Sequence, residues 1–166
     1  MFCTTTASTS YPTSGDGGPA TSARLSGPTD VIVDDLGNVY IADSFNFRIR
    51  SISQDGIIKT VAGVGTSGFS GDGGPATSAQ FGFPYALALD SDGSLYVADG
   101  GDGYDNVAND RIRKIFGPRT DFNGMITTIA GDGNEGYSED GGPAISASLS
   151  FPTALGGRFR RQRLHP

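Results

Sequence analysis

Gly71-Asp72-Gly73-Gly74-Pro75-Ala76-Thr77-Ser78-Ala79 decides how the chain is organised, because this segment occurs three times. It recurs unchanged at residues 15–23 and with two substitutions at residues 139–147. Its glycines permit the positive φ of tight turns, its aspartate can bond the amides that follow, and its proline presets a short helical turn. A connector repeated this closely implies that the segments between its copies also repeat.

The segment after the first connector contains four short apolar runs separated by turn residues. Short β-branched runs bounded by Asp, Asn and Gly predict strands joined by tight turns. Four strands in succession predict an antiparallel meander, and residues 63–83 then cross to the next unit. The runs lie at residues 30–33, 39–42, 48–52 and 57–62.

A second unit repeats this plan with two insertions. The connector spacing is 56 residues from Asp16 to Asp72 and 68 residues from Asp72 to Asp140. The difference arises within residues 100–108 and 116–123, which are turns, and turns tolerate added residues. A third unit begins at Pro152 and keeps the pattern only as far as Leu155. The four predicted strands of the second unit are residues 86–89, 95–98, 111–115 and 125–130.

Composition and charge exclude several classes of protein. The 26 glycines, the 9 prolines and the lack of helix-period apolar stripes favour an all-β fold. No apolar run is long enough to span a membrane, and the N-terminus lacks the pattern of a signal peptide. Net charge is −6, although four of the twelve basic residues lie in the last nine positions. The rest of the chain is therefore more acidic than the net charge indicates. It would repel the phosphate backbone of a nucleic acid, which argues against nucleic acid as a partner.

The first strand of each unit is apolar on both faces, which requires cover on both sides of the sheet. A lone four-stranded sheet cannot provide that cover, whereas radial stacking of equivalent sheets can. The pattern therefore predicts a β-propeller whose first strands lie nearest the axis. The predicted fold class is all-β: a propeller fragment of about two complete four-stranded blades plus partial edges.

The repeat units also resemble a known family. Residues 37–43 (GNVYIAD) with 46–50 (NFRIR), and residues 92–99 (DGSLYVAD) with 109–113 (NDRIR), are similar to NHL repeats. The linkage from Thr60 through the connector resembles bacterial secreted NHL-repeat proteins and the NHL domain of teneurins. This resemblance implies a propeller that closes with about six blades. It divides the chain into a non-repeat segment at 1–13, a partial NHL propeller at 14–155 and a basic non-repeat tail at 156–166.

Few residues are suited to catalysis. The only histidine, His165, lies in the tail, although NHL-type lyases use metal-bound histidines near the axis. A lactonase-like metal site would need several first-strand carboxylates. Asp30 is one, but Ala86 and Ala154 occupy the equivalent positions, so we expect Asp30 to face water in the central channel. We therefore predict no catalytic residue, no metal ligand and no required cofactor.

The recurring polar residues are expected to be structural. Residues 90–94 and 34–38 resemble a calcium loop only superficially, and hairpin turns explain both. Asp43 and Asp99 recur with an asparagine and an arginine in each unit. They predict turn bonding and an Asp–Arg pair, for which the repeat suggests Arg48 and Arg111. Phe69 and Tyr137 are equivalent connector residues, suited either to packing or to partner contact.

The first insertion supplies the candidate binding residues. Its carboxylates and amide could hold calcium weakly, although we favour a flexible acidic loop as the explanation. The candidate residues are Asp102, Tyr104, Asp105, Asn106 and Asp110.

The functional expectation is a non-catalytic NHL interaction module that binds a protein or a carbohydrate through propeller loops. The alternative is part of a propeller hydrolase or lyase whose catalytic residues lie on other blades. The resemblance suggests an extracellular location. Because strands that are buried in a complete ring would be exposed at two open faces, we also expect the isolated chain to self-associate.

Overall fold

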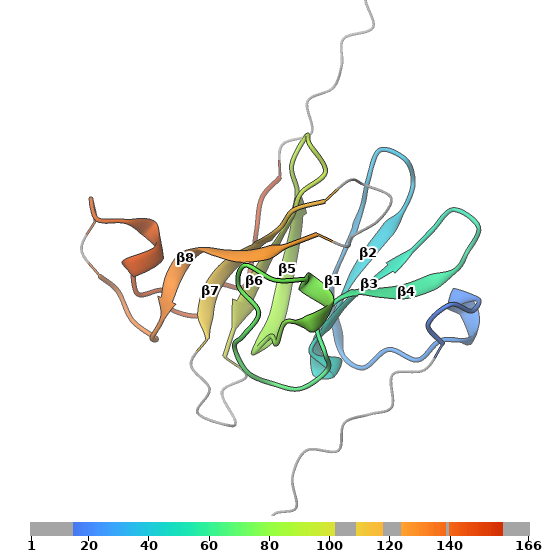
Figure 1. Cartoon of the computed structure of the whole chain (residues 1–166), viewed down its shortest axis with the longest axis horizontal. Helices are drawn as coiled ribbons and strands as arrows, with labels where there is room; N and C mark the ends of the chain where they lie inside the picture. The colour runs from blue at the N-terminus through green and yellow to red at the C-terminus, as the bar shows by residue number, and fades with distance from the viewer. Residues whose placement is uncertain (1–14, 102–108, 118–123, 139, 158–166) are drawn as a thin grey trace, which may run out of the picture.

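The computed structural model describes residues 15–101, 109–117, 124–138 and 140–157. They form two antiparallel four-stranded sheets, in the orders β1-β2-β3-β4 and β5-β6-β7-β8 (Figure 1). Each sheet is an uninterrupted meander, as the four-run pattern predicts. The prediction of an all-β fold with two propeller-type blades is therefore confirmed.

Blade 1 consists of β1 (Pro28–Val33), β2 (Val39–Asp43), β3 (Arg48–Ile52) and β4 (Ile58–Ala62). Blade 2 consists of β5 (Phe83–Leu89), β6 (Leu95–Gly100), β7 (Asp110–Ile115) and β8 (Ile126–Gly133). The first strand of each blade begins earlier than predicted. In both blades the pairing of the first and second strands continues across an irregularity in register, at 28/30 in β1 and at 84/86 in β5, and so reaches residues before the predicted apolar run.

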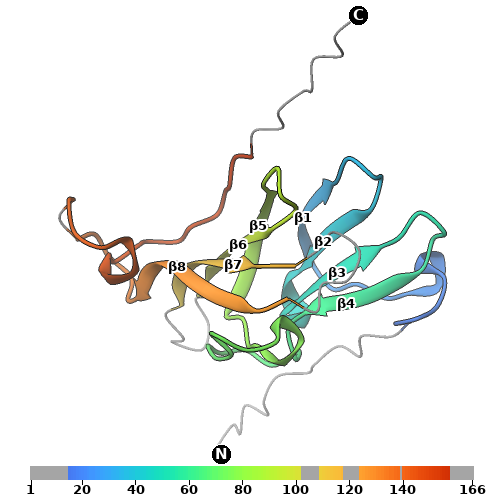
Figure 2. The same cartoon turned by 45° about the horizontal axis from the view of Figure 1, so that its top comes forward.

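The two blades fan out from their first strands. β1 packs beside β5, and the sheets diverge toward β4 on one side and β8 on the other (Figure 2). This is the arrangement of neighbouring propeller blades, with the first strand innermost. The widening gap between the sheets is filled by the second connector. Most of the core lies there, and its buried side chains come from both sheets and the connector: Tyr40, Ala42, Ile49, Val61, Ala62, Ala76, Ala79, Phe81, Leu87, Leu89, Leu95, Val97, Ile115 and Ile126.

The three connectors fold alike. Each contains one short 3-10 turn directly after its proline: η1 (Ala20–Ser22), η3 (Ala76–Ser78) and η4 (Ala144–Ser146). The predicted helical turns are thus confirmed, although they are single 3-10 turns. A fourth, η2 (Ser44–Asn46), lies between β2 and β3.

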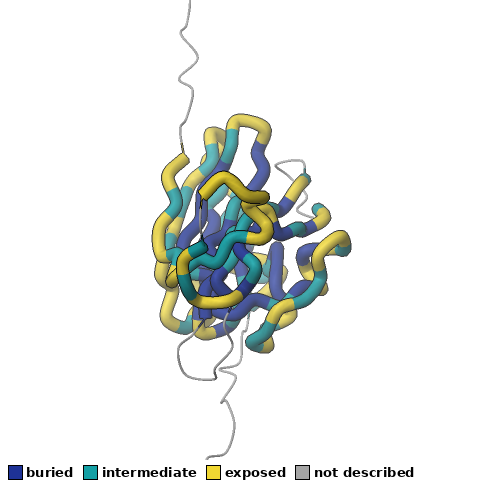
Figure 3. The backbone as a smooth tube through the Cα atoms, turned by 90° about the vertical axis from the view of Figure 1, so that its left-hand side faces the viewer, coloured by how far each residue is buried: buried dark blue, intermediate teal, exposed yellow. Residues whose placement is uncertain are grey.

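The connectors also close the outer edges of the blades. In the first connector, Gly17 donates its amide to Ile58 at 2.8 Å and Gly18 accepts from Ile58 at 3.1 Å. In the second, Gly73 donates to Ile126 at 2.8 Å and Gly74 accepts at 3.0 Å. Each of these two connectors therefore runs beside the fourth strand of the blade that follows it, whose edge would otherwise carry unpaired amides and carbonyls. Buried residues accordingly line the centre of the molecule, while turns and connector tips are exposed (Figure 3).

Candidate functional site

Each blade contains a buried arginine that links it to the connector preceding it. Arg113 in β7 is fully buried, and its Nη2 lies 2.7 Å from Oδ1 of Asp72. It also donates to the carbonyl oxygens of Gln80 at 2.7 Å and Ser70 at 2.9 Å. Asp99, at the end of β6, lies 3.7 Å from Nη1. We call this set of connector aspartate, third-strand arginine and second-strand aspartate the arginine network.

Blade 1 carries the same network. Arg50 in β3 is fully buried, 2.6 Å from Asp16 and 3.5 Å from Asp43. Register explains the placement, because Ile41 pairs with Arg50 and side chains alternate along β2, so that Asp43 and Arg50 share one face. The connector is thus tied to the following blade through a side chain as well as through the backbone.

The sequence-based assignment of the arginine partners was wrong. Arg48 lies directly opposite Asp43 in the register of β2 and β3, and its Nη2 donates to the carbonyl of Val64 at 2.8 Å. Its equivalent, Arg111, donates to the carbonyl of Asp132, also at 2.8 Å, and lies over the ring of Phe69 at 3.7 Å. Phe69 therefore packs against an arginine of the next blade, whereas its equivalent Tyr137 is 81% exposed.

The predicted turn bonding of the second-strand aspartates is confirmed. Asn46 donates to Asp43 at 2.9 Å, and Asn109 donates to Asp99 at 2.7 Å. Burial raises the pKa of Asp99 to about 7, although Arg113, Asn109 and neighbouring backbone amides oppose the shift. These carboxylates hold the β2–β3 and β6–β7 corners in place.

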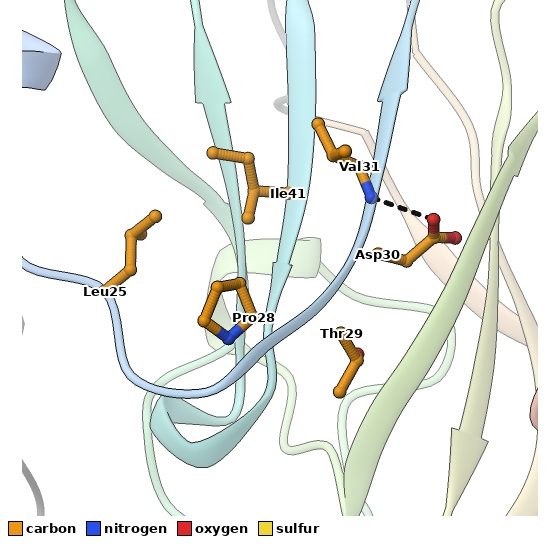
Figure 4. Close-up of a pocket in the computed structure, with 6 residues that line it drawn as sticks. All are labelled: Leu25, Pro28, Thr29, Asp30, Val31 and Ile41. Carbon is orange, nitrogen blue, oxygen red and sulfur yellow. Dashed lines mark hydrogen bonds between the residues drawn. The ribbon is translucent and has the colours of Figure 1, made fainter.

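Asp30 does not face water in the central channel, contrary to expectation. Its Oδ2 accepts the amide of Leu87 in blade 2 at 2.7 Å, and its Oδ1 accepts the amide of Val31 at 2.8 Å (Figure 4). Thr29 donates to the Tyr85 carbonyl at 2.7 Å beside it. The only first-strand carboxylate among the equivalent positions 30, 86 and 154 thus joins the two blades.

Two further interblade contacts had no signal in the sequence. Ser44 donates to the Pro84 carbonyl at 2.7 Å. The ring of Phe45 meets that of Phe83 edge-on, with centroids 5.2 Å apart. Both depend on where η2 lies relative to β5, a long-range relationship that periodicity within one unit does not reveal.

The two aspartate-rich turns are hairpin turns, as predicted. Asp90 Oδ1 accepts the amides of Asp92 at 3.0 Å and Ser94 at 2.8 Å. Burial acts to raise the pKa of Asp90, but the hydrogen bonds from Ser94, Lys114 and Tyr96 outweigh it and hold this pKa below its usual value. Asp34 makes the equivalent bonds to Leu36 and Asn38. Each carboxylate thus closes its own turn.

The candidate residues of the first insertion are divided by the structure. Asp102, Tyr104, Asp105 and Asn106 lie outside the described residues. Asp110 is described and is 2% exposed. Burial raises its pKa; the amides of Gly101 and Phe151 bond its carboxylate and oppose that shift. Asp110 is therefore buried and bonded within the blade and is not open to a ligand. In the described parts of the chain, no group of three or more His, Cys, Asp or Glu could hold a metal ion.

A pocket of about 350 Å³ lies on the outer face of blade 1. Its lining residues are Leu25, Pro28, Thr29, Asp30, Val31 and Ile41 (Figure 4). Val31 is 60% exposed. Its equivalent 56 residues later, Leu87, is only 2% exposed, because it packs against blade 1. The pocket thus belongs to the sheet face that, in blade 2, packs against a neighbouring blade.

Comparison with known proteins agrees with the resemblance of the repeats. The Teneurin NHL domain model matches residues 4–69. Human teneurin-1 is 36% identical over 109 residues, which make up 62% of this chain and 4% of teneurin-1. Human NHL repeat-containing protein 3 is 32% identical over 81 residues, 47% of this chain and 21% of that protein. These matches support an NHL-repeat family for the chain.

A solved structure supports the same fold. A structural genomics protein of unknown function from Bacteroides thetaiotaomicron matches this NHL-repeat chain with a TM-score of 0.60 at 23% identity. The match covers 81% of this chain and 30% of the bacterial protein. This NHL-repeat chain therefore spans only a small part of each of these relatives. In its described portion, no helix is long and apolar enough to cross a membrane.

Proposed function

We propose that this NHL-repeat chain is a non-catalytic interaction module that binds a protein or a carbohydrate through the loops at one end of its blades. The observation that carries the proposal is how the recurring polar side chains are used. Asp16, Asp72, Arg50 and Arg113 join connectors to blades, and Asp30 joins blade to blade. Residues that could have served chemistry instead build a rigid scaffold.

The two blades share the same scaffold but differ in the lengths of their loops. The β2–β3 corner needs only η2, whereas the equivalent β6–β7 corner carries the insertion at residues 100–108. Loops placed on a rigid framework are common binding elements. Asp102, Tyr104, Asp105 and Asn106 in this insertion are the proposed contact residues, with weak calcium binding as an accessory property.

A loop exchange tests the proposal. Residues 100–108 are replaced by Ser-Phe, the sequence that completes the equivalent corner of blade 1, and a panel of glycans and extracellular protein domains is screened against both forms. We expect a ligand of the unmodified chain to bind the exchanged chain at least tenfold more weakly. Replacing residues 116–123 with Ser-Gln-Asp is the matched control, because it shortens the turn at the opposite end of β7.

The outcome that contradicts the proposal is equal binding by the unmodified chain and the first exchange, or equal loss in both exchanges.

The alternative, a hydrolase or lyase, requires inner-strand ligands near the axis, and Asp30 is engaged between the blades. An extracellular location is part of the same proposal and follows from the resemblance to teneurins.

A further inference from the structure

The third connector repeats a structure that holds an arginine in the other two. In the second connector, the guanidinium of Arg113 is bound by the Asp72 carboxylate and the carbonyls of Ser70 and Gln80. The ring of Phe69 lies 4.9 Å from the same guanidinium. In the first connector, Asp16 binds Arg50 at 2.6 Å. A guanidinium held by a carboxylate, two carbonyls and an aromatic face is well matched in charge and geometry.

The equivalent groups of the third connector follow directly from the repeat. Asp140 corresponds to Asp72, and Tyr137 corresponds to Phe69. The carbonyls of Ser70 and Gln80 correspond to those of Ser138 and Ser148. We call these four residues of the third connector the arginine receptor.

The receptor keeps its shape without an arginine. Pro143 has φ −61° and ψ 130°, close to the −62° and 132° of Pro75. Gly136 donates to the Leu149 carbonyl at 3.0 Å, as Gly68 does to Phe81. Ser148 donates its amide to Ser138 Oγ at 3.1 Å, which joins the two segments where a backbone bridge links Ser70 and Gln80. Little rearrangement is therefore needed for binding.

Within the part of the chain that the structure describes, the receptor is open. Asp140 is exposed and Tyr137 is 81% exposed, whereas Asp72 and Phe69 are partly covered by blade 2. Within the described residues no lysine or arginine lies within ion-pair distance of Asp140. Asp132 and Glu135 lie in the same stretch of chain and add negative charge, which favours a cationic ligand.

The backbone beside the receptor specifies the shape of the ligand. In the second connector, Gly73 and Gly74 pair with Ile126 in the fourth strand of blade 2, and Ala76 donates to the carbonyl of Gly124 just before that strand. Arg113 comes from the third strand. The third connector carries the same sequence of donors and acceptors at Gly141, Gly142 and Ala144. We infer that the third connector is a binding site for a β-hairpin that pairs with this backbone and inserts an arginine into the receptor.

The ligand comes from outside the two described blades. Their arginines at this position, Arg50 and Arg113, are both fully buried in their own networks. A second copy of this chain would have to break one network to fill another, with no net gain. The fitting partner is a hairpin of another polypeptide segment with an arginine on its first strand. This site lies on the connector, so it is independent of the loop binding proposed above.

A peptide binding experiment tests the inference. The probe is a backbone-cyclised hairpin with the sequence of residues 48–62, which contains Arg50, and the control probe carries citrulline at that position. Citrulline keeps the shape of arginine and removes its charge. The full chain is titrated as wild type, Asp140→Asn and Asp92→Asn. Asp92 is an exposed turn carboxylate, so its substitution matches the change in charge.

We expect saturable binding of the arginine hairpin to the wild type and to Asp92→Asn, and binding at least about tenfold weaker to Asp140→Asn, because a charge-assisted bond is lost. The citrulline hairpin should bind all three forms equally weakly. Equal affinity of the two hairpins, equal affinity of the two variants for the arginine hairpin, or no saturable binding by the wild type would each overturn the inference.

Discussion

Arg113 and Asp72 form a short ion pair, 2.7 Å between Nη2 and Oδ1, across the junction of a connector and the blade that follows it. The arginine is fully buried, whereas the carboxylate remains one-third exposed. Asp72 also accepts the amide of Thr128 in β8 at 3.0 Å through its other oxygen. One connector side chain therefore fixes both the third and the fourth strand of blade 2.

Removing this carboxylate should destabilise the fold. In Asp72→Ala, Arg113 keeps its charge in a buried site and the amide of Thr128 loses its acceptor, so we expect a loss of about 1–3 kcal/mol in the free energy of unfolding. Urea denaturation measures it. The Asp92→Ala control should stay within about 0.5 kcal/mol of wild type. Adding Arg113→Met to Asp72→Ala should restore part of the loss, and a further loss would contradict the buried-charge explanation.

Asp99 should make stability depend on pH. Its folded pKa, about 7, exceeds the ordinary value of 3.8, so the folded state binds this proton more tightly than the unfolded state. The stabilising contribution is complete below about pH 4 and is lost as pH rises toward 7, with a slope of at most about 1.4 kcal/mol per pH unit. We expect Asp99→Asn to have a flatter profile in urea denaturation between pH 4.5 and 8. Parallel profiles for the two proteins would show that Asp99 is ionised throughout this range.

The contact between blades through Asp30 can be tested in the same way. Asp30→Ala leaves the amide of Leu87 without its acceptor in a partly buried site, and we expect a cost of about 1–2 kcal/mol in the free energy of unfolding. Asp30→Asn keeps one acceptor oxygen and should cost less. If Asp30→Ala matches wild type, water replaces the carboxylate without loss and the contact is not a determinant of stability.

Two connector glycines form a matched pair for substitution. Gly71 has φ +92°, and a Cβ there would lie 2.7 Å from Cα of Ala79. Gly73 has φ +78°, with no atom within 4 Å of the equivalent Cβ. Gly73→Ala should cost about 1–2 kcal/mol from backbone strain alone. Gly71→Ala should lower the thermal midpoint further because its Cβ also clashes with backbone, and equal midpoints would contradict this packing.

The repeat pattern was sufficient to predict the eight strands, their order and the connector turns. Short apolar runs separated by turn residues are a local signal of strands. The three copies of the connector then showed where each unit begins and ends. The arginine partners were wrong although both arginines of the third strand lie on the same face as the second-strand aspartate: Asp43 is directly opposite Arg48 and one pair away from Arg50. Choosing Arg50 over Arg48 requires the position of the connector, because Asp16 of the connector binds Arg50, and periodicity within one unit does not contain that information.

Contacts between repeats were harder to predict than contacts within them. Asp30 was assigned to the channel because its equivalents are alanines, and its acceptor role depends on how closely β1 approaches β5. Pairing of the first two connectors with the fourth strands that follow them likewise joins segments about 40 residues or more apart in the sequence. Of the predicted insertion site, only Asp110 lies in the described part of the chain, so that site stays a prediction.

Self-association through the outer face of blade 1 is the final prediction. Val31 and Val33 are 60% and 49% exposed there, while the equivalent Leu87 and Leu89 are 2% and 7% exposed beneath blade 1. An apolar sheet face of this kind promotes association in water. We expect light scattering at micromolar concentration to show assemblies larger than the 17.1 kDa chain.

Val31→Lys with Val33→Lys should shift the chain toward monomer, because charge on this face opposes its burial against another apolar surface. Leu36→Lys, at a 45% exposed position on the β1–β2 turn, is the control and should leave the association unchanged. A wild-type chain that is monomeric and resists proteolysis would show that this face is stable in water without a partner. Association that persists in the double variant but not in the control would place the contact on a different surface.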